Sequence, residues 1–214
     1  MTLAVDQLSL GAIGTNCYIV RRDESASQAA VVDPGADAAQ IQLSLDRAGV
    51  VCTAILLTHS HYDHIGALAE LAETTAASVW LPAGELDVFR RPNDFFGALG
   101  VSIRGYEGES TLLAGGETIA AAEIDFEVTA VPGHSPGHVA YHAYGCLFSG
   151  DVLFAGSVGR TALPFGSWDQ LLASIRTLAA AYPPETVVYS GHGSATTLGA
   201  ELARNPFLTE LRAS

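Results

Sequence analysis

A dense group of possible metal ligands follows an apolar run in the first third of the chain. Residues 54–57 read Ala-Ile-Leu-Leu, and His59, His61, Asp63 and His64 lie within the six residues that begin at position 59. Imidazole and carboxylate groups together suit zinc, iron or manganese. A polar loop without a metal is the simpler alternative, but three of the chain's 7 histidines lie here. The pattern therefore predicts a metal site.

Three further candidates lie far apart in the sequence. His134, Asp151 and His192 each follow an apolar run, and a glycine directly precedes each of them. Glycine allows a tight backbone turn, so that the side chain can project from a sheet edge into a shared cleft. Taken singly, each could be a surface or core residue. Together with the first group they give seven donors, which match two sites of three or four ligands each. We therefore expect two divalent metal ions, with zinc favoured and iron or manganese as alternatives.

Apolar patterning predicts the elements that must position these residues. Short β-rich runs predict strands over residues 16–20, 29–32, 54–57, 124–128 and 186–189. Helical periodicity predicts helices over residues 38–48, 65–74, 168–181 and 198–204, with a mainly β stretch up to residue 150. This order suggests two sheets covered by helices. No linker-like stretch divides the chain, so we expect a single domain over residues 1–214.

Composition limits the class of partner. The 214 residues are 49% hydrophobic and carry a formal net charge of -13, with only 10 basic residues. Such a charge argues against nucleic acid, which attracts Lys and Arg. No signal peptide or membrane-spanning run is visible, and Cys17, Cys52 and Cys146 look like reduced core residues. We expect a cytoplasmic enzyme with a small-molecule substrate and no membrane partner; the sequence gives no signal for an oligomeric state.

The sequence resembles the metallo-β-lactamase fold superfamily and, within it, the short glyoxalase II-like (hydroxyacylglutathione hydrolase) branch. The resemblance covers nearly the whole chain. A histidine after Asp63, where many class B β-lactamases carry arginine, favours the hydrolase branches. The motifs that carry the resemblance are His59-Ser60-His61-Tyr62-Asp63-His64, Gly133-His134-Ser135-Pro136-Gly137-His138, Phe148-Ser149-Gly150-Asp151, Gly159-Arg160-Thr161, Gly191-His192-Gly193 and Asn205-Pro206-Phe207.

The resemblance implies a fold and an assignment of ligands. The fold would be an α/β four-layer αββα sandwich with the metals at the sheet edges. His59, His61 and His134 would bind one ion, and Asp63, His64 and His192 would bind the other. Asp151 would bridge the two ions, in agreement with its chemistry, because a carboxylate has two oxygens that can each bind a cation.

These assignments lead to a hypothesis for the chemistry. Two nearby cations would lower the pKa of a shared water from about 15.7 towards 7, and the resulting metal-bound hydroxide would be the nucleophile. Asp63 would act as the catalytic residue that orients the nucleophile and accepts its proton. A thioester suits this chemistry, since a metal can receive the leaving thiolate. Arg160 is expected to bind a substrate carboxylate, because a guanidinium binds planar anions through two hydrogen bonds.

Other functions use the same residues. A lactonase or β-lactamase-like hydrolase would need the same ligands, and a mononuclear iron persulfide dioxygenase could use His59, His134 and Asp151. A zinc-stabilised binding module without activity is disfavoured, because structural zinc sites favour cysteine and no cysteine lies in the ligand motifs. Near the C-terminus, Glu210 would repel a carboxylate and only Arg212 would attract one, which argues against glutathione as the thiol.

Some neighbouring residues allow two interpretations. Asp33 could hold a ligand histidine or simply occupy a turn. His138 and His142 are expected to be packed strand histidines. The segment over residues 83–109 contains four aromatic side chains that could wall the pocket, but we expect them to pack internally with one exposed.

Overall fold

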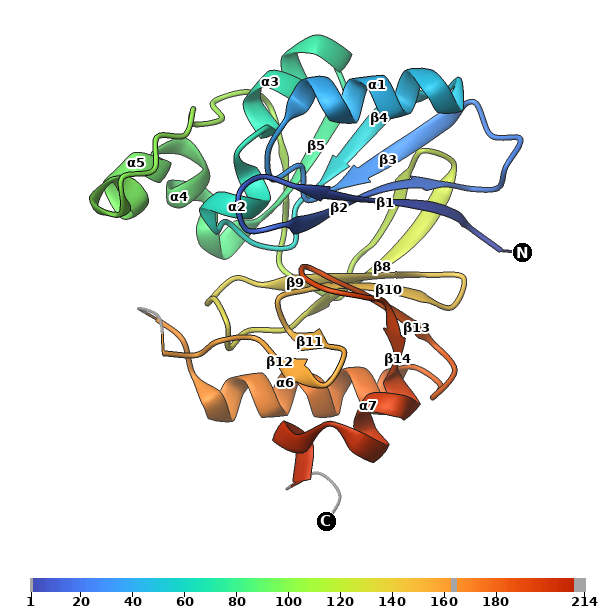
Figure 1. The fold of residues 1–214 in the computed structure, drawn as a ribbon, viewed down its shortest axis with the longest axis vertical. Helices are drawn as coiled ribbons and strands as arrows, with labels where there is room; N and C mark the ends of the chain where they lie inside the picture. The colour runs from blue at the N-terminus through green and yellow to red at the C-terminus, as the bar shows by residue number, and fades with distance from the viewer. Residues whose placement is uncertain (1, 163–164, 210–214) are drawn as a thin grey trace.

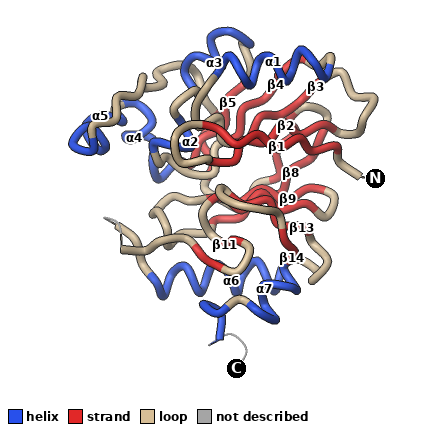
Figure 2. Tube along the Cα trace, viewed as in Figure 1, coloured by secondary structure: helices blue, strands red, loops and turns tan. Residues whose placement is uncertain are grey.

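The computed structural model describes residues 2–162 and 165–209, and Glu210 and Arg212 therefore lie outside the described residues. Two six-stranded sheets pack face to face between two layers of helices (Figure 1). Figure 2 shows the strands of both sheets in the middle and the helices on the outside. The predicted four-layer αββα sandwich is confirmed. That residues 1–214 form one domain stays a prediction.

The first sheet has the order β1-β2-β3-β4-β5-β6 and is parallel from β3 to β6. Helices α1 and α3 cover its outer face, where their apolar side chains join one core cluster. Its strands are β1 Ala4–Leu10, β2 Thr15–Arg21, β3 Gln28–Val32, β4 Val51–Leu56, β5 Ser78–Pro82 and β6 Thr111–Leu113, and its helices are α1 Ala38–Ala48 and α3 Leu68–Thr75.

The second sheet has the order β14-β13-β10-β9-β8-β7, with β10 and β13 parallel. Helices α6 and α7 cover its outer face. Its strands are β7 Thr118–Ala121, β8 Ile124–Ala130, β9 Val139–Ala143, β10 Cys146–Gly150, β13 Val187–Ser190 and β14 Thr196–Thr197; α6 is Trp168–Ala181 and α7 is Leu198–Arg204. A small hairpin of β11 Leu153–Phe154 and β12 Ser157–Val158 follows β10.

Aromatic side chains fill the space between the sheets. Phe126, Tyr141, Phe148 and Tyr18 lie in one buried cluster. Both tyrosine hydroxyl groups donate across the sandwich: Tyr141 to the carbonyl of Leu57 at 2.7 Å, and Tyr18 to that of Ser190 at 2.6 Å. A buried hydroxyl without a partner would cost about 1–3 kcal/mol. These pairs therefore fix how the two sheets face each other.

The predicted strands and helices are present, with two differences. The stretch up to residue 150 was expected to be mainly β, but it contains the short helices α4 Leu86–Arg90 and α5 Pro92–Phe96. The other difference lies near the predicted ligands. The helix expected over residues 65–74 is divided into α2 Tyr62–Ile65 and α3 Leu68–Thr75. Between them, Gly66 lies so close to Gly35 that a Cβ on Gly66 would be 2.3 Å from the Gly35 carbonyl oxygen. The next residue, Ala67, donates its N–H to Pro34 O at 3.0 Å. A tertiary contact thus interrupts the helix that local periodicity predicted.

Among the described residues, no helix combines the length and apolar character that crossing a bilayer requires. The remaining short elements lie outside the sandwich layers. They are the 3-10 helix Ala83–Glu85, α4 Leu86–Arg90, α5 Pro92–Phe96, and the 3-10 helices Gly97–Leu99 and Pro206–Leu208.

The three cysteines are free and buried, as the sequence predicted. Burial raises the pKa of the Cys52 thiol to about 11 and that of Cys17 well above its usual range. A raised pKa leaves less thiolate at mildly alkaline pH, and the thiolate is the reactive form.

We therefore expect Cys17 and Cys52 to resist a chromogenic disulfide reagent in the folded protein and all three thiols to react in denaturant. Rapid reaction of both residues without denaturant would contradict this packing.

Candidate metal centre

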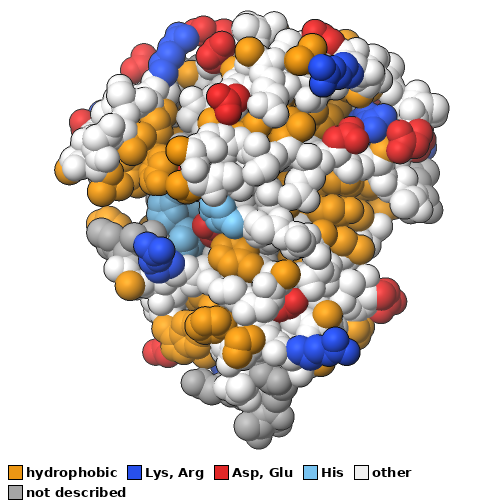
Figure 3. Space-filling model, in the orientation of Figure 1, with side chains coloured by type: hydrophobic (Ala, Val, Ile, Leu, Met, Phe, Trp, Pro, Cys, Tyr) orange, Lys and Arg blue, Asp and Glu red, His pale blue; other side chains and the backbone are white. Residues whose placement is uncertain are grey.

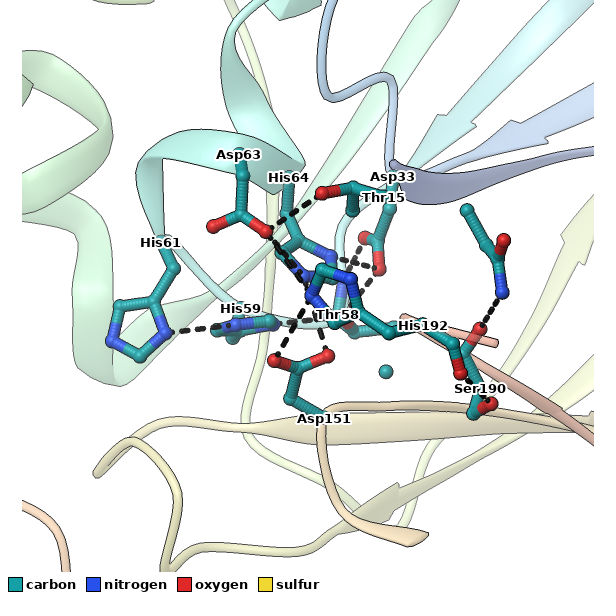
Figure 4. A network of polar contacts seen from close by, with 12 residues as sticks. Thr15, Asp33, Thr58, His59, His61, Asp63, His64, Asp151, Ser190 and His192 are labelled. Carbon is teal, nitrogen blue, oxygen red and sulfur yellow. Dashed lines mark hydrogen bonds and ion pairs between the residues drawn. The ribbon is translucent and has the colours of Figure 1, made fainter. Parts of the chain in front are cut away.

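The seven predicted ligands lie together at one edge of the sandwich, although they come from both sheets. His59 and His61 follow β4, and Asp63 and His64 lie on α2. The other three follow strands of the second sheet: His134 comes after β8, Asp151 after β10 and His192 after β13. Because β10 and β13 are parallel, their carboxyl ends reach the same edge. Figure 4 shows six of the seven in close-up.

Three histidines form the first pocket, which we call the three-histidine pocket. His61 Nδ1 lies 3.1 Å from His59 Nε2 and 2.7 Å from His134 Nε2. Each residue offers one nitrogen, and the three nitrogens lie within 4.8 Å of one another. Three imidazole nitrogens that converge in this way match the ligand set of a zinc or iron site.

Asp63, His64 and His192 form a second pocket beside the first. Asp63 Oδ2 lies 3.4 Å from His64 Nε2 and 3.3 Å from His192 Nε2. Asp151 contacts both pockets: its Oδ1 is 3.4 Å from His64 Nε2, and its Oδ2 is 3.5 Å from His134 Nε2. The Asp151 carboxylate is thus in reach of nitrogens in both pockets.

The glycines before the late ligands serve two different purposes. Gly133 and Gly150 have positive φ angles of 139° and 49°, so they provide the turn that the sequence predicted. Gly191 has no positive φ and provides space instead. A Cβ on Gly191 would lie 2.1 Å from Asp151 Oδ1 and 2.7 Å from His64 Cε1.

Asp33 holds two of the ligand rings from behind, which decides between its two interpretations. Its Oδ2 accepts from His64 Nδ1 at 2.9 Å and from the Thr58 hydroxyl at 2.6 Å. The Thr58 oxygen accepts in turn from His59 Nδ1 at 3.0 Å. Both rings therefore carry a proton on Nδ1 and direct Nε2 towards the pockets. Asp33, His59 and His64 also lie close enough together to hold a metal ion. However, Asp33 Oδ2 and the Nδ1 atoms of both histidines already take part in the hydrogen bonds just described.

Two further contacts orient the ligands of the second sheet. His134 Nδ1 donates to the backbone oxygen of Arg160 at 2.7 Å, while the Arg160 side chain is exposed. His138 was expected to be a packed histidine, and it is fully buried. Its Nε2 also accepts the Asp151 N–H at 3.1 Å, and its ring stacks on His59 at 4.6 Å between centroids. His142 stacks on Tyr182 away from the ligands, as expected of a packed histidine.

Sequence reasoning missed the residues at the start of β2 that join the two sheets at the site. Thr15 donates its hydroxyl to Asp63 Oδ2 at 2.8 Å. Asn16 donates its side-chain amide to Ser190 O at 2.8 Å and Gly193 O at 2.9 Å, on either side of His192. The only local signal is a polar Thr-Asn pair at the start of an apolar strand. Their partners are more than 45 positions away in the sequence.

The histidines of the two pockets have pKa values that are shifted in opposite directions. Burial, helped by neighbouring histidines, lowers the pKa of His61 to about 4, and burial also lowers the pKa of His59 and His134. Burial alone would lower the pKa of His64, but the Asp151 and Asp33 carboxylates raise it well above its usual range. The contact with Asp63 raises the pKa of His192. The three histidines of the first pocket are thus neutral at neutral pH. In the second pocket, a metal cation would displace protons from His64 and His192.

The donor atoms fit divalent metal ions. His64 Nε2 and Asp151 Oδ1 are buried and have no hydrogen-bond partner among the described residues. Buried polar atoms without partners are costly and rare in proteins. Here both atoms face the pockets where the other ligand atoms converge, so a cation would satisfy them.

The pockets open into a hollow between the two halves of the molecule. Figure 3 shows histidine surface at the bottom of this hollow, with apolar side chains above and below it. The rings of Phe96 and His61 are 6.0 Å apart, and those of Phe154 and His192 are also 6.0 Å apart. The expectation for residues 83–109 was therefore wrong in part: Phe89 packs internally and Phe95 is exposed, but Phe96 borders the site.

Comparison with known proteins agrees with the fold and the site. The family described as the Metallo-beta-lactamase superfamily matches residues 10–192, and the chain belongs to this family. The hydroxyacylglutathione hydrolase GloC of Haemophilus influenzae is 32% identical over 209 residues, which cover 95% of this chain and 97% of the relative. The chain therefore has the metallo-hydrolase fold of this superfamily and has glyoxalase II-like relatives. The resemblance seen in the sequence is confirmed.

Two solved structures are similar over nearly their whole length. The BLEG-1 B3 metallo-beta-lactamase has a TM-score of 0.90 and 40% identity, over 96% of this chain and 100% of the other. TTHA1623 in a di-iron-bound form has a TM-score of 0.85 and 38% identity, over 95% of this chain and 100% of the other.

The space that Gly191 leaves can be tested by filling it. Gly191→Ala should displace the Asp151 carboxylate and destabilise the metal-free protein by about 1–3 kcal/mol, the usual cost of overpacking. Gly97→Ala is the matched control, because a Cβ there meets nothing within 4 Å and its φ is -58°. Denaturant unfolding of both variants measures the difference. Equal stability of the Gly191 and Gly97 variants would contradict the packing described here.

Proposed function

We propose that the protein is a dinuclear metal-dependent hydrolase that cleaves a thioester or a related small acyl compound. The observation that carries the proposal is the pair of adjacent pockets with Asp151 in reach of both. One pocket alone would suffice for a mononuclear enzyme. The second pocket is as completely built, because Thr15 and Asn16 hold Asp63 and the His192 loop in place.

The geometry of each pocket supports an assignment of ligands. His59, His61 and His134 would hold one ion, Asp63, His64 and His192 the other, and Asp151 would bridge them. When bound, such ions would lower the pKa of a water and polarise the substrate carbonyl. The similarity to the Haemophilus influenzae hydroxyacylglutathione hydrolase supports a thioester substrate. We favour zinc, and the di-iron-bound form of TTHA1623 supports iron as the alternative metal.

Asp63 is the catalytic residue of this proposal. Burial alone would raise its pKa, but the contact with His192 and the nearby His64 lower it to about 2. The carboxylate is therefore ionised at neutral pH and can accept a proton. Thr15 fixes its Oδ2, while Oδ1 has no hydrogen bond to another described residue. Oδ1 is the atom left to orient the attacking water.

The surroundings of the pockets suit a substrate with an apolar part and an anionic part. Phe96 and Phe154 offer ring surface on the two sides of the site. Arg160 has an exposed side chain, and its backbone oxygen is bonded to His134, so it lies next to the three-histidine pocket. We propose that its guanidinium binds a carboxylate of the substrate.

A second candidate function is hydrolysis of β-lactams. The 40% identity with a B3 metallo-beta-lactamase over 96% of the chain favours it. A cyclic amide would use the same ligands and the same water. Assay of a chromogenic cephalosporin beside S-lactoylglutathione and simpler thioesters separates the two, and a clear preference for the cephalosporin would overturn the proposed substrate class.

Removal of the bridging group tests the two-metal scheme. Elemental analysis of the unmodified protein should give two metal ions per chain. Asp151→Ala should lower the metal content below two ions per chain. It should also lower thioester hydrolysis by more than the roughly 10- to 100-fold that loss of an outer hydrogen-bond partner costs. Unchanged metal content together with unchanged hydrolysis would overturn the scheme.

The iron dioxygenase alternative predicts a different pair of measurements. It requires one iron per chain and oxygen uptake that depends on a thiol persulfide. The proposed hydrolase instead releases a thiol and a carboxylic acid without consuming oxygen. Finding one iron and oxygen uptake would replace the hydrolase by the dioxygenase.

The ring of Phe96 gives a test of substrate contact. Phe96→Ala should raise KM for an apolar thioester about two- to tenfold and leave kcat nearly unchanged, because it removes apolar contact and no ligand. Phe95→Ala is the matched control, since this neighbouring ring is 45% exposed. Equal kinetic effects of the two variants would show that Phe96 does not border the bound substrate.

A further inference from the structure

One buried carboxylate near the site belongs to neither pocket. Glu85 is only 3% exposed and ends the 3-10 helix Ala83–Glu85. Its Oε2 accepts from the backbone N–H of Ser60 at 2.7 Å and from the Ser60 hydroxyl. Its Oε1 accepts from the N–H of Gly137 at 2.9 Å and from the Ser135 hydroxyl. A carboxylate offers about four lone-pair positions, so all of its acceptor sites are occupied.

The donors to Glu85 belong to the two loops that form the three-histidine pocket. Ser60 lies between His59 and His61, and Ser135 directly follows His134. One side chain therefore joins a loop of the first sheet to a loop of the second. Its hydrogen bonds reach neither Asp63 nor His192, which belong to the other pocket.

The backbone is shaped for this contact. A Cβ on Gly137 would lie 2.7 Å from Glu85 Cγ and 3.1 Å from Gly84 Cα. Glycine at positions 84 and 137 thus lets the two segments approach to a distance that a side chain would prevent. The chain continues from Glu85 into α4 and α5, and α5 carries the Phe96 ring beside His61.

His61 is the ligand that depends most on this arrangement. The His59 and His134 rings are each held by a hydrogen bond through Nδ1. His61 directs its Nδ1 into the pocket, and its Nε2 has no hydrogen bond to another described residue. Its ring is therefore placed by its backbone and by Phe96, and Glu85 fixes that backbone at Ser60.

We infer that Glu85 is a positioning residue for the three-histidine pocket, which holds its ligand loops at the spacing that a metal ion requires. The inference rests on the proposed metal sites. Glutamine at this position has one acceptor oxygen, and its NH₂ group would face two of the present donors. Glu85→Gln should therefore loosen the three-histidine pocket and leave the other pocket intact.

The experiment measures zinc affinity in each pocket separately, by competition with a chromophoric chelator. His192→Ala leaves the three-histidine pocket complete, and His61→Ala leaves the other pocket complete. Adding Glu85→Gln should weaken zinc binding about 10- to 100-fold in the first background, as loss of an outer partner does elsewhere. In the second background the change should stay below about threefold.

Glu201→Gln is the matched control. Glu201 is also buried and accepts from a backbone N–H, a hydroxyl and an amide, those of Gly156, Thr196 and Asn205. It should leave zinc affinity unchanged in the His192→Ala background. Ser135→Ala removes a single donor to Glu85 and should weaken the same pocket by a smaller factor, which keeps the inference testable if the Glu85 variant does not fold.

Different outcomes distinguish the role of Glu85 from the existence of the metal sites. Zinc binding that Glu85→Gln or Ser135→Ala leaves unchanged in the His192→Ala background would overturn the role of Glu85 alone. An equal loss in both backgrounds would also overturn it, because it would show general destabilisation. An unmodified chain that binds no zinc, iron or manganese would overturn the proposed metal sites as well.

Discussion

Backbone hydrogen bonds join the two sheets at the edge where the ligands converge. Asn16 N–H donates to Gly191 O at 2.7 Å, and Val139 N–H donates to Thr58 O at 2.9 Å. The apolar packing between the sheets is non-directional and would tolerate small displacements. Metal sites tolerate only about 0.2 Å in their ligand distances. Because the ligands come from both sheets, these directional contacts decide whether the pockets exist.

The burial of the candidate ligands is unfavourable for the stability of the fold. Five imidazoles and two carboxylates lie close together, and burying polar groups without partners is unfavourable. Asp33, Thr58, His138 and the Arg160 carbonyl satisfy the outward-facing atoms of the ligands. The atoms that face inward would be satisfied by bound metal ions. The same arrangement therefore lowers the stability of the metal-free protein and prepares the ligands for binding.

The ligands and the substrate surface belong to different parts of the structure. The candidate ligands lie on α2 and in the loops that follow β4, β8, β10 and β13, all of them strands of the two sheets. The rings that border the hollow come from α5 and the β11–β12 hairpin, which lie outside the two sheets. Sequence changes in these outer segments would alter the surface around the hollow more than the positions of the candidate ligands. Such a separation would allow one fold to carry different activities.

The sequence by itself identified the candidate ligands and predicted most of the sandwich. Histidines and aspartates after apolar runs are a local signal. The apolar patterning of β2, β3, β4 and α6, whose apolar side chains are largely buried in the structure, is another. Only the tertiary structure decided which groups hold those ligands. Glu85, Asn16 and His138 look like ordinary polar residues in the sequence. Their roles depend on partners up to 177 positions away, and periodicity reports burial but not which strand ends meet in space.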